Sequence, residues 1–141
     1  MIRWLTHLGG ARVTIGTGLG LIAVGDRDVG VAVLVALTLS HIVVQILKRA
    51  VARPRPCDAY GRPLALVDLP DPFSFPSGHA AAATAVAGAV SMAHPLAAPV
   101  LIPLAAWIAY SRVALRVHHV GDVIAGVALG AAGVAAASAL L

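Results

Sequence analysis

Apolar residues occur in long uninterrupted blocks along this chain of 141 residues. Residues 29–47 and 123–141 each contain 19 residues without Asp, Glu, Lys or Arg, and residues 78–111 form a third such run of 34. About 20 apolar residues, each rising about 1.5 Å, cross the hydrocarbon core of a bilayer. The first two runs therefore predict one membrane span each, and the third must fold back on itself.

His94 and Pro95 lie in the middle of the longest run, where a proline beside a polar residue favours a turn. The stretch 4–25 is interrupted by Arg12, which can reach the interface; we expect a span there, with an amphipathic surface helix as the alternative. It lacks the residue progression of a cleavable signal peptide. We predict an all-α, integral-membrane helical bundle of about five transmembrane helices, at about 4–25, 29–47, 77–93, 96–112 and 119–141.

The long polar stretch 48–76 separates the second and third predicted spans. Its prolines prevent a regular helix through most of it. Because a long loop of this kind commonly carries function, we expect 1–141 to be a single membrane-embedded domain with active-site residues on this loop. The prolines are Pro54, Pro56, Pro63, Pro70, Pro72 and Pro76.

The composition excludes a water-soluble domain, because 60% of the residues are hydrophobic and only 11% are charged. Cys57 is the single cysteine, which excludes an internal disulfide and leaves too few thiols for a structural zinc site. The net charge of +4 comes from basic residues beside the apolar spans rather than along one polar face. This placement favours anionic lipid or phosphate, and not nucleic acid, as the partner.

Small residues are frequent in the apolar runs. The spacing of Gly126 and Gly130 predicts close packing of the last helix against its neighbours. Gly16, Gly18 and Gly20 lack the spacing and the strand–helix setting of a dinucleotide-binding motif, so we interpret them as helix-packing positions too.

Five spans place the loop 48–76 and the segment 112–122 on one side of the membrane. A bias of positive charge toward one side explains clustered Lys and Arg, but not Ser, His and Asp at the span ends. The opposite side receives little besides Asp26, Arg27, Asp28 and His94. The polar residues collected on the first side include Lys48, Arg49, Arg53, Arg55, Arg62, Ser77, His79, Arg112, Arg116, His118, His119 and Asp122.

Three of these cations, Lys48, Arg55 and Arg112, have the charge and the N–H donors that suit a phosphoryl group. Ser77 and Gly78 open a helix after the proline-rich loop, where free N–H groups and the helix dipole favour an anion. The same Pro-Ser-Gly sequence also matches an ordinary helix N-cap, which is the stronger interpretation of that motif alone.

His118 and Asp122 are four residues apart, so on a helix they would share one face, with the carboxylate accepting the Nδ1 proton. The free Nε2 is then a nucleophile toward phosphorus, and His79 could protonate the departing alkoxide. Interfacial histidines satisfied by water are the alternative. His119, three residues from Asp122, leaves the identity of the nucleophile open.

Three motifs together resemble the type-2 phosphatidic acid phosphatase superfamily of lipid phosphate phosphatases, whose signature vanadium haloperoxidases share. They are Lys48-x6-Arg55-Pro56, Pro76-Ser77-Gly78-His79 and Ser111-Arg112-x5-His118-x3-Asp122. The resemblance covers 48–122, about half the chain.

The resemblance implies a role for each matching residue. Lys48, Arg55 and Arg112 would bind phosphate, assisted by Ser77 and the Gly78 amide. His79 would be the general acid, His118 the nucleophile that forms a phosphohistidine, and Asp122 the group that orients it. The resemblance selects His118 over His119 and implies neither a metal nor another cofactor.

Family members usually have six spans, whereas five are predicted here. With a cytoplasmic N-terminus, five spans place the site at the cytoplasmic face of the cell membrane. Charge agrees, since the basic residues outside the three phosphate-binding positions favour that side by six to one. The six are Arg3, Arg12, Arg49, Arg53, Arg62 and Arg116, against Arg27.

The leading hypothesis is a membrane phosphatase for a lipid phosphate monoester or diphosphate. Polyprenyl phosphates and diphosphates, prenyl-linked sugar phosphates, phosphatidylglycerophosphate and phosphatidic acid all fit, and the sequence does not predict the oligomeric state. A non-catalytic helical subunit that binds anionic lipid headgroups is the alternative, while five apolar spans disfavour a vanadate-dependent peroxidase. Arg49, Arg53, Tyr60 and Arg62 are expected to solvate the loop rather than to recognise a headgroup.

Overall fold

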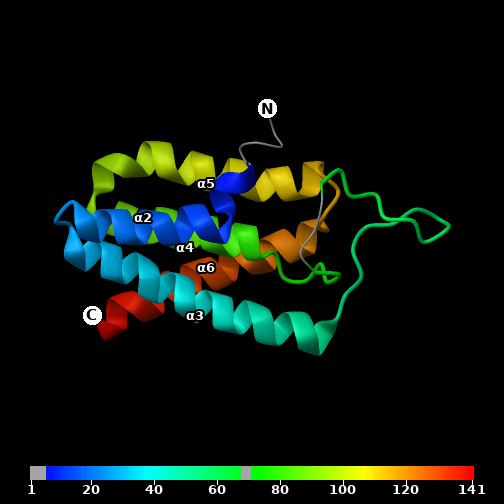
Figure 1. The fold of residues 1–141 in the computed structure, drawn as a ribbon, viewed down its shortest axis with the longest axis horizontal. Helices are drawn as coiled ribbons and strands as arrows, with labels where there is room; N and C mark the ends of the chain where they lie inside the picture. Colours follow the sequence, from blue (N-terminus) through cyan, green and yellow to red (C-terminus); the bar gives the residue numbers. More distant parts are fainter. Residues whose placement is uncertain (1–5, 68–70) are drawn as a thin grey trace.

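The computed structural model describes residues 6–67 and 71–141, which form a helical bundle (Figure 1). The predicted all-helical class is confirmed, and the turn at His94 and Pro95 lies between two helices as expected. The predicted start of the first span at Trp4, together with Arg3 and Pro70, lies outside the described residues. The elements are η1 (Thr6–Gly9), α2 (Ala11–Ala23), α3 (Arg27–Val51), α4 (Gly78–Ala93), η2 (Pro95–Ala97), α5 (Ala98–Ala114) and α6 (Val120–Leu140).

Among the residues that the structure describes, three helical segments are long and apolar enough to cross a membrane: Arg27–Val51, Pro95–Ala114 and Val120–Leu140. The helices α2 and α4 are apolar but shorter. The N-terminal stretch is not one continuous helix, because the η1 turn ends at Gly9 and Gly10 has an extended backbone before α2 begins. Glycines lose more conformational freedom than other residues in a helix, which explains a break at this pair.

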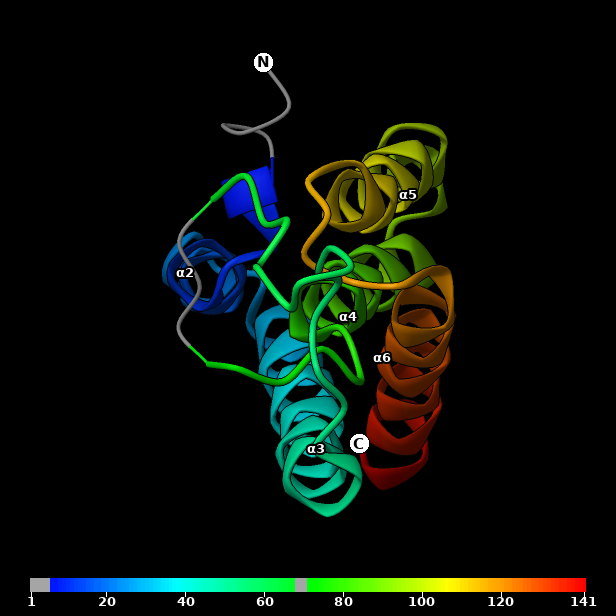
Figure 2. The same ribbon diagram turned by 90° about the vertical axis from the view of Figure 1, so that its right-hand side faces the viewer.

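Helix α4 lies at the centre of the bundle, with α2, α3, α5 and α6 around it (Figure 2). Its sequence is largely apolar around the helix, as expected for a helix surrounded by other helices, and Met92 in its last turn is exposed. Small side chains allow the four neighbours to approach it closely. Its buried residues are Ala80, Ala81, Ala83, Ala85, Ala87 and Ala89.

Glycines bring α6 against the bundle. A methyl group at Gly126 would overlap the carbonyl oxygen of Ser77, and one at Gly130 would overlap that of Ala81. The predicted packing role of Gly126 and Gly130 is confirmed. In α2 only Gly18 is packed in this way, because side chains at Gly16 and Gly20 would meet open space.

The two ends of the bundle differ in their polar residues. At one end, His94 Nε2 lies 2.6 Å from Asp26 Oδ2 and joins the α2–α3 turn to the α4–α5 turn. At the other end lie the C-terminus of α3, the loop 52–77, the N-terminus of α4, and the turn between α5 and α6 (Figure 1). The predicted site residues belong to these segments, so the fold collects them at one end of the bundle.

Candidate active site

Two cations of the site come from the end of α3 and from the loop that follows. Lys48 lies in the last turn of α3, and left-handed Ala52 ends that helix and starts the loop carrying Arg55. Only 9% of the Lys48 side chain and 10% of the Arg55 side chain are exposed. Cations with so little exposure require partners, because burial of an unpaired charge is costly.

Asp71 supplies that partner for both cations. Lys48 Nζ lies 2.9 and 2.8 Å from the two carboxylate oxygens, and Arg55 Nη2 lies 3.1 Å from Oδ1. Burial by itself would raise the pKa of Asp71, but the Lys48 hydrogen bond and the charges of Lys48 and Arg55 outweigh it and lower the pKa below its usual value. The carboxylate is therefore ionised. Sequence reasoning missed Asp71, since no motif spacing points to it.

Arg112, in the last turn of α5, is the third cation. It is buried, and its Nη1 donates to Thr6 Oγ1 at 2.8 Å. Among the described residues, no hydrogen-bond partner faces Arg112 Nε. Thr6, which the sequence did not single out, thus links the N-terminal η1 turn to this cation.

His118 lies in the turn before α6 and is 4% exposed. Its Nδ1 is 2.5 Å from the carbonyl oxygen of Ser74. Because a carbonyl oxygen only accepts, this contact assigns the proton to Nδ1 and leaves Nε2 unprotonated. Burial, followed by the charges of Arg112 and Arg55, lowers the pKa of His118 to about 3, so the imidazole is neutral.

The expectation that His118 and Asp122 share a helical face is wrong, because α6 begins at Val120 and His118 precedes it. His118 Nδ1 is 3.8 Å from Asp122 Oδ2, beyond hydrogen-bond length. The structure nevertheless brings the two side chains close together. Ser74 takes the position nearest to Nδ1, a role that no sequence motif indicated.

Asp122 is completely buried and is held by two other groups. Its Oδ2 accepts from the backbone N–H of His119 at 2.7 Å, and its Oδ1 accepts from Arg53 Nη1 at 3.0 Å. His119 is the N-cap residue of α6, so this contact caps the start of that helix. The expectation that Arg53 solvates the loop is therefore wrong, although 44% of its side chain is exposed.

Ser77 and His79 lie where α4 begins. The Ser77 hydroxyl accepts from the Ala80 amide at 3.4 Å, as expected of an N-cap, and its own amide donates to the Asp122 carbonyl at 2.9 Å. Gly78 is the first residue of α4. His79 packs beside Gly9 and Gly10 of the N-terminal segment, and the charges of Arg112, Lys48 and Arg55 act on it.

The other loop residues lie apart from this cluster. Arg62 pairs with Asp58 at 2.7 Å and lies 5.3 Å from the centre of the Tyr60 ring, in an exposed part of the loop. This arrangement agrees with the expected solvating role of Arg62 and Tyr60. The predicted residues that the structure brings to one end of the bundle are Lys48, Arg55, Ser77, Gly78, His79, Arg112, His118 and Asp122.

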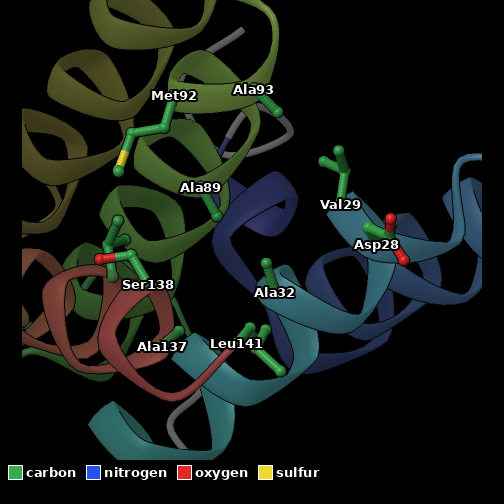
Figure 3. A pocket seen from close by; sticks show the side chains of 10 residues that line it. Asp28, Val29, Ala32, Ala89, Met92, Ala93, Ala137, Ser138 and Leu141 are labelled. Atoms are coloured by element: carbon green, nitrogen blue, oxygen red, sulfur yellow. The ribbon is translucent and has the colours of Figure 1, made fainter.

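A cavity of about 310 Å³ lies at the opposite end of the bundle, between α3, α4 and α6 (Figure 3). Alanine, valine, methionine and leucine side chains line most of it, with Asp28 and Ser138 as its polar residues. Few polar groups converge there, so the polar cluster at the other end is the candidate active site.

Known proteins resemble this chain in sequence and in fold. Over 94 residues, 66% of the chain, it is 42% identical to decaprenylphosphoryl-5-phosphoribose phosphatase of Mycobacterium tuberculosis H37Rv, and the match covers 50% of that protein. The chain thus spans about half the length of this curated relative.

Two crystal structures share the fold. LpxE from Aquifex aeolicus aligns over 98% of this chain and 83% of its own, at a TM-score of 0.85 and 25% identity. A transmembrane PAP2 type phosphatidylglycerolphosphate phosphatase from Bacillus subtilis aligns over 99% of this chain and 74% of its own, at a TM-score of 0.78 and 26% identity.

The apolar helices and the likeness to a transmembrane phosphatase identify a membrane protein. The model of the PAP2 superfamily matches residues 29–141, which include all three motifs. The resemblance found in the sequence is confirmed: the chain belongs to the PAP2 superfamily.

Proposed function

We propose that this chain is a membrane phosphatase that hydrolyses a lipid phosphate monoester or diphosphate through a phosphohistidine. The observation that carries the proposal is the gathering of Lys48, Arg55 and Arg112 around a neutral His118 at one end of an apolar bundle. Cations with many N–H donors stabilise the equatorial oxygens of a phosphoryl group in its transition state. An unprotonated imidazole nitrogen is the nucleophile that such a site needs.

In the first step the substrate phosphate lies against Lys48, Arg55 and Arg112, with the Ser77 hydroxyl and the Gly78 amide as further donors. His118 Nε2 forms a bond to phosphorus while the bond from phosphorus to the ester or bridging oxygen breaks. His79, protonated beside the dianionic substrate, gives its proton to the departing oxygen. The imidazole gains positive charge, which the Asp122 carboxylate 3.8 Å away stabilises.

In the second step water hydrolyses the phosphohistidine. His79, now neutral, takes a proton from water as the water oxygen bonds to phosphorus, and the bond from phosphorus to Nε2 breaks. Inorganic phosphate leaves and His118 returns to its neutral form. His79 therefore acts as acid and then as base, so the cycle returns both histidines to their initial protonation states.

The position of the site supports a lipid as the substrate. The cations lie where apolar helices end, so a phosphate can reach them while its acyl or prenyl tail stays among the helices and lipid. The names of the similar proteins, a decaprenylphosphoryl-5-phosphoribose phosphatase and a phosphatidylglycerolphosphate phosphatase, indicate phosphates on lipid carriers. A non-catalytic subunit that binds headgroups remains the contrasting hypothesis, and it predicts no turnover.

Phosphate release from a lipid panel tests the proposal. The purified protein is assayed with phosphatidic acid, phosphatidylglycerophosphate, polyprenyl phosphate and polyprenyl diphosphate in detergent micelles. We expect release that survives EDTA, is blocked by vanadate, and falls by about 1,000-fold or more in His118→Ala, because the nucleophile is lost. The matched variant His119→Ala should keep most of the activity. Full activity in His118→Ala, or no turnover of any lipid by the parent, would contradict the proposal.

We also propose that the chain crosses the membrane several times, with the site at the cytoplasmic face, on the strength of the charge bias along the sequence. Cys57 tests this placement, since it is the single cysteine and lies exposed in the site loop. A membrane-impermeant maleimide should leave Cys57 unlabelled in intact cells and label it after the membrane is opened. Equal labelling in both preparations would place the site on the outer face.

A further inference from the structure

Both groups that face Nδ1 of His118 are held by Arg53. The Ser74 carbonyl accepts from Nδ1, while the Asp122 carboxylate lies 3.8 Å away. The Arg53 backbone carbonyl accepts from the Ser74 amide at 2.8 Å, and its guanidinium donates to Asp122 at 3.0 Å. One residue thus links the loop segment that carries Ser74 to the helix that carries Asp122, and both of these groups lie near Nδ1 of the imidazole.

We propose that Arg53 is a positioning residue that fixes His118 for attack on phosphorus. The inference rests on the proposed function and adds to it a residue outside the three motifs. Within residues 6–67 and 71–141, the polar contacts of the Arg53 side chain and carbonyl are to Ser74 and Asp122 rather than to the cations of the phosphate site. Its effect therefore passes through the imidazole, and it should change turnover more than substrate binding.

The charge of Arg53 also acts on the imidazole. The charged groups that act on His118 are Lys48 of α3, Arg55 of the loop and Arg112 of α5, together with Asp122 of α6. Asp122 is the carboxylate near it, and Arg53 pairs with that carboxylate. Without Arg53 the field of Asp122 at the imidazole is stronger, which favours protonation of His118 and raises its pKa.

The test compares Arg53→Gln, Arg53→Lys and the control Arg62→Gln on the best substrate of the lipid panel. Arg62 is a suitable control because it is also a loop arginine paired with an aspartate, Asp58, outside the site. For Arg53→Gln we expect kcat to fall about tenfold or more, with KM changed less than about twofold. The acid limb of its kcat/KM profile should move up by about half a pH unit, because His118 is protonated more readily.

The other variants separate positioning from folding. Arg53→Lys keeps the charge and should recover most of kcat and the parental pH profile, and Arg62→Gln should match the parent. The inference is overturned if Arg53→Gln keeps the parental kcat or raises KM alone. It is also overturned if Arg53→Gln and Arg53→Lys both lose kcat while the pH profile does not move. If the parent shows no turnover at all, the proposed function itself fails.

A separate observation concerns Asp71, whose carboxylate forms ion pairs with Lys48 and Arg55, two of the three cations proposed to bind phosphate. Lys48 directs its ammonium group to both Asp71 oxygens and to the Phe73 carbonyl. Arg55 donates to the Asp71 side chain, to the Asp71 carbonyl and to the Val117 carbonyl. The Lys48 ammonium is thus directed at three protein oxygens, and three of the five Arg55 N–H groups have protein acceptors, so a phosphate oxygen must replace an acceptor to bind Lys48 and competes with Asp71 for Arg55.

The Asp71 carboxylate is the acceptor most suited to replacement. It is one-third exposed, at 32%, and it carries the same charge sign as phosphate. We infer that Asp71 determines the affinity of the site for phosphate by competing for Lys48 and Arg55, again within the proposed function. The alternative is that Asp71 orients the two cations, in which case its removal would weaken anion binding.

Binding of orthovanadate distinguishes these two roles without turnover. Its dissociation constant is measured by thermal shift for the parent, Asp71→Asn and the control Asp58→Asn, which alters the exposed carboxylate paired with Arg62. We expect Asp71→Asn to bind vanadate about tenfold more tightly, because a charged competitor is removed from two hydrogen-bonded cations. Asp58→Asn should match the parent.

Unchanged or weaker vanadate binding by Asp71→Asn would overturn the inference. If Asp71→Asn binds vanadate more tightly but the parent releases no phosphate from any lipid, the inference on anion binding holds and the phosphatase proposal is rejected. The two failures are therefore distinguishable.

Discussion

Pairing of buried charge is the constraint on which the candidate site depends. Lys48, Arg55 and Arg112 are largely removed from water, and such cations are stable only beside acceptors or opposite charge. Asp71 neutralises one of these three positive charges and Arg53 pairs with Asp122, which leaves an excess of two positive charges near His118. A phosphate dianion carries the complementary charge. The cationic charges that, after burial, lower the pKa of His118 therefore also favour the anion that His118 would attack.

Close helix packing places this charge next to the imidazole. Gly126 allows α6 to approach the carbonyl of Ser77, and the Ser77 amide in turn donates to the Asp122 carbonyl. The N-termini of α4 and α6 are thereby fixed side by side, with Ser77 on one helix and Asp122 on the other. The alanine-rich α4 makes this possible because its small side chains let the neighbouring helices surround it. The close packing of the apolar helices therefore determines the positions of the polar residues at this end of the bundle.

The sequence predicted the features that follow from hydropathy and motif spacing. The positions of α3, α4, α5 and α6, the turn at His94 and the gathering of the motif residues at one end all follow from these patterns. The break at Gly9–Gly10 was missed because hydropathy alone does not report backbone conformation. Asp71 and Ser74 were missed, and Arg53 was assigned to loop solvation, because their roles arise from contacts between the loop and the helices. Arg53 and Asp122 are 69 residues apart in sequence, and no local pattern reports such a pair.

The central claim is that a lipid phosphate is transferred to Nε2 of His118 before water releases it. The most direct measurement is rapid alkaline quenching of the protein during turnover, followed by mass spectrometry of the peptide that contains His118 and His119. We expect an acid-labile, base-stable phosphoryl group on His118 that appears within the first turnover and disappears as substrate is exhausted. Turnover with an unmodified His118, or with the phosphoryl group on His119, would contradict it.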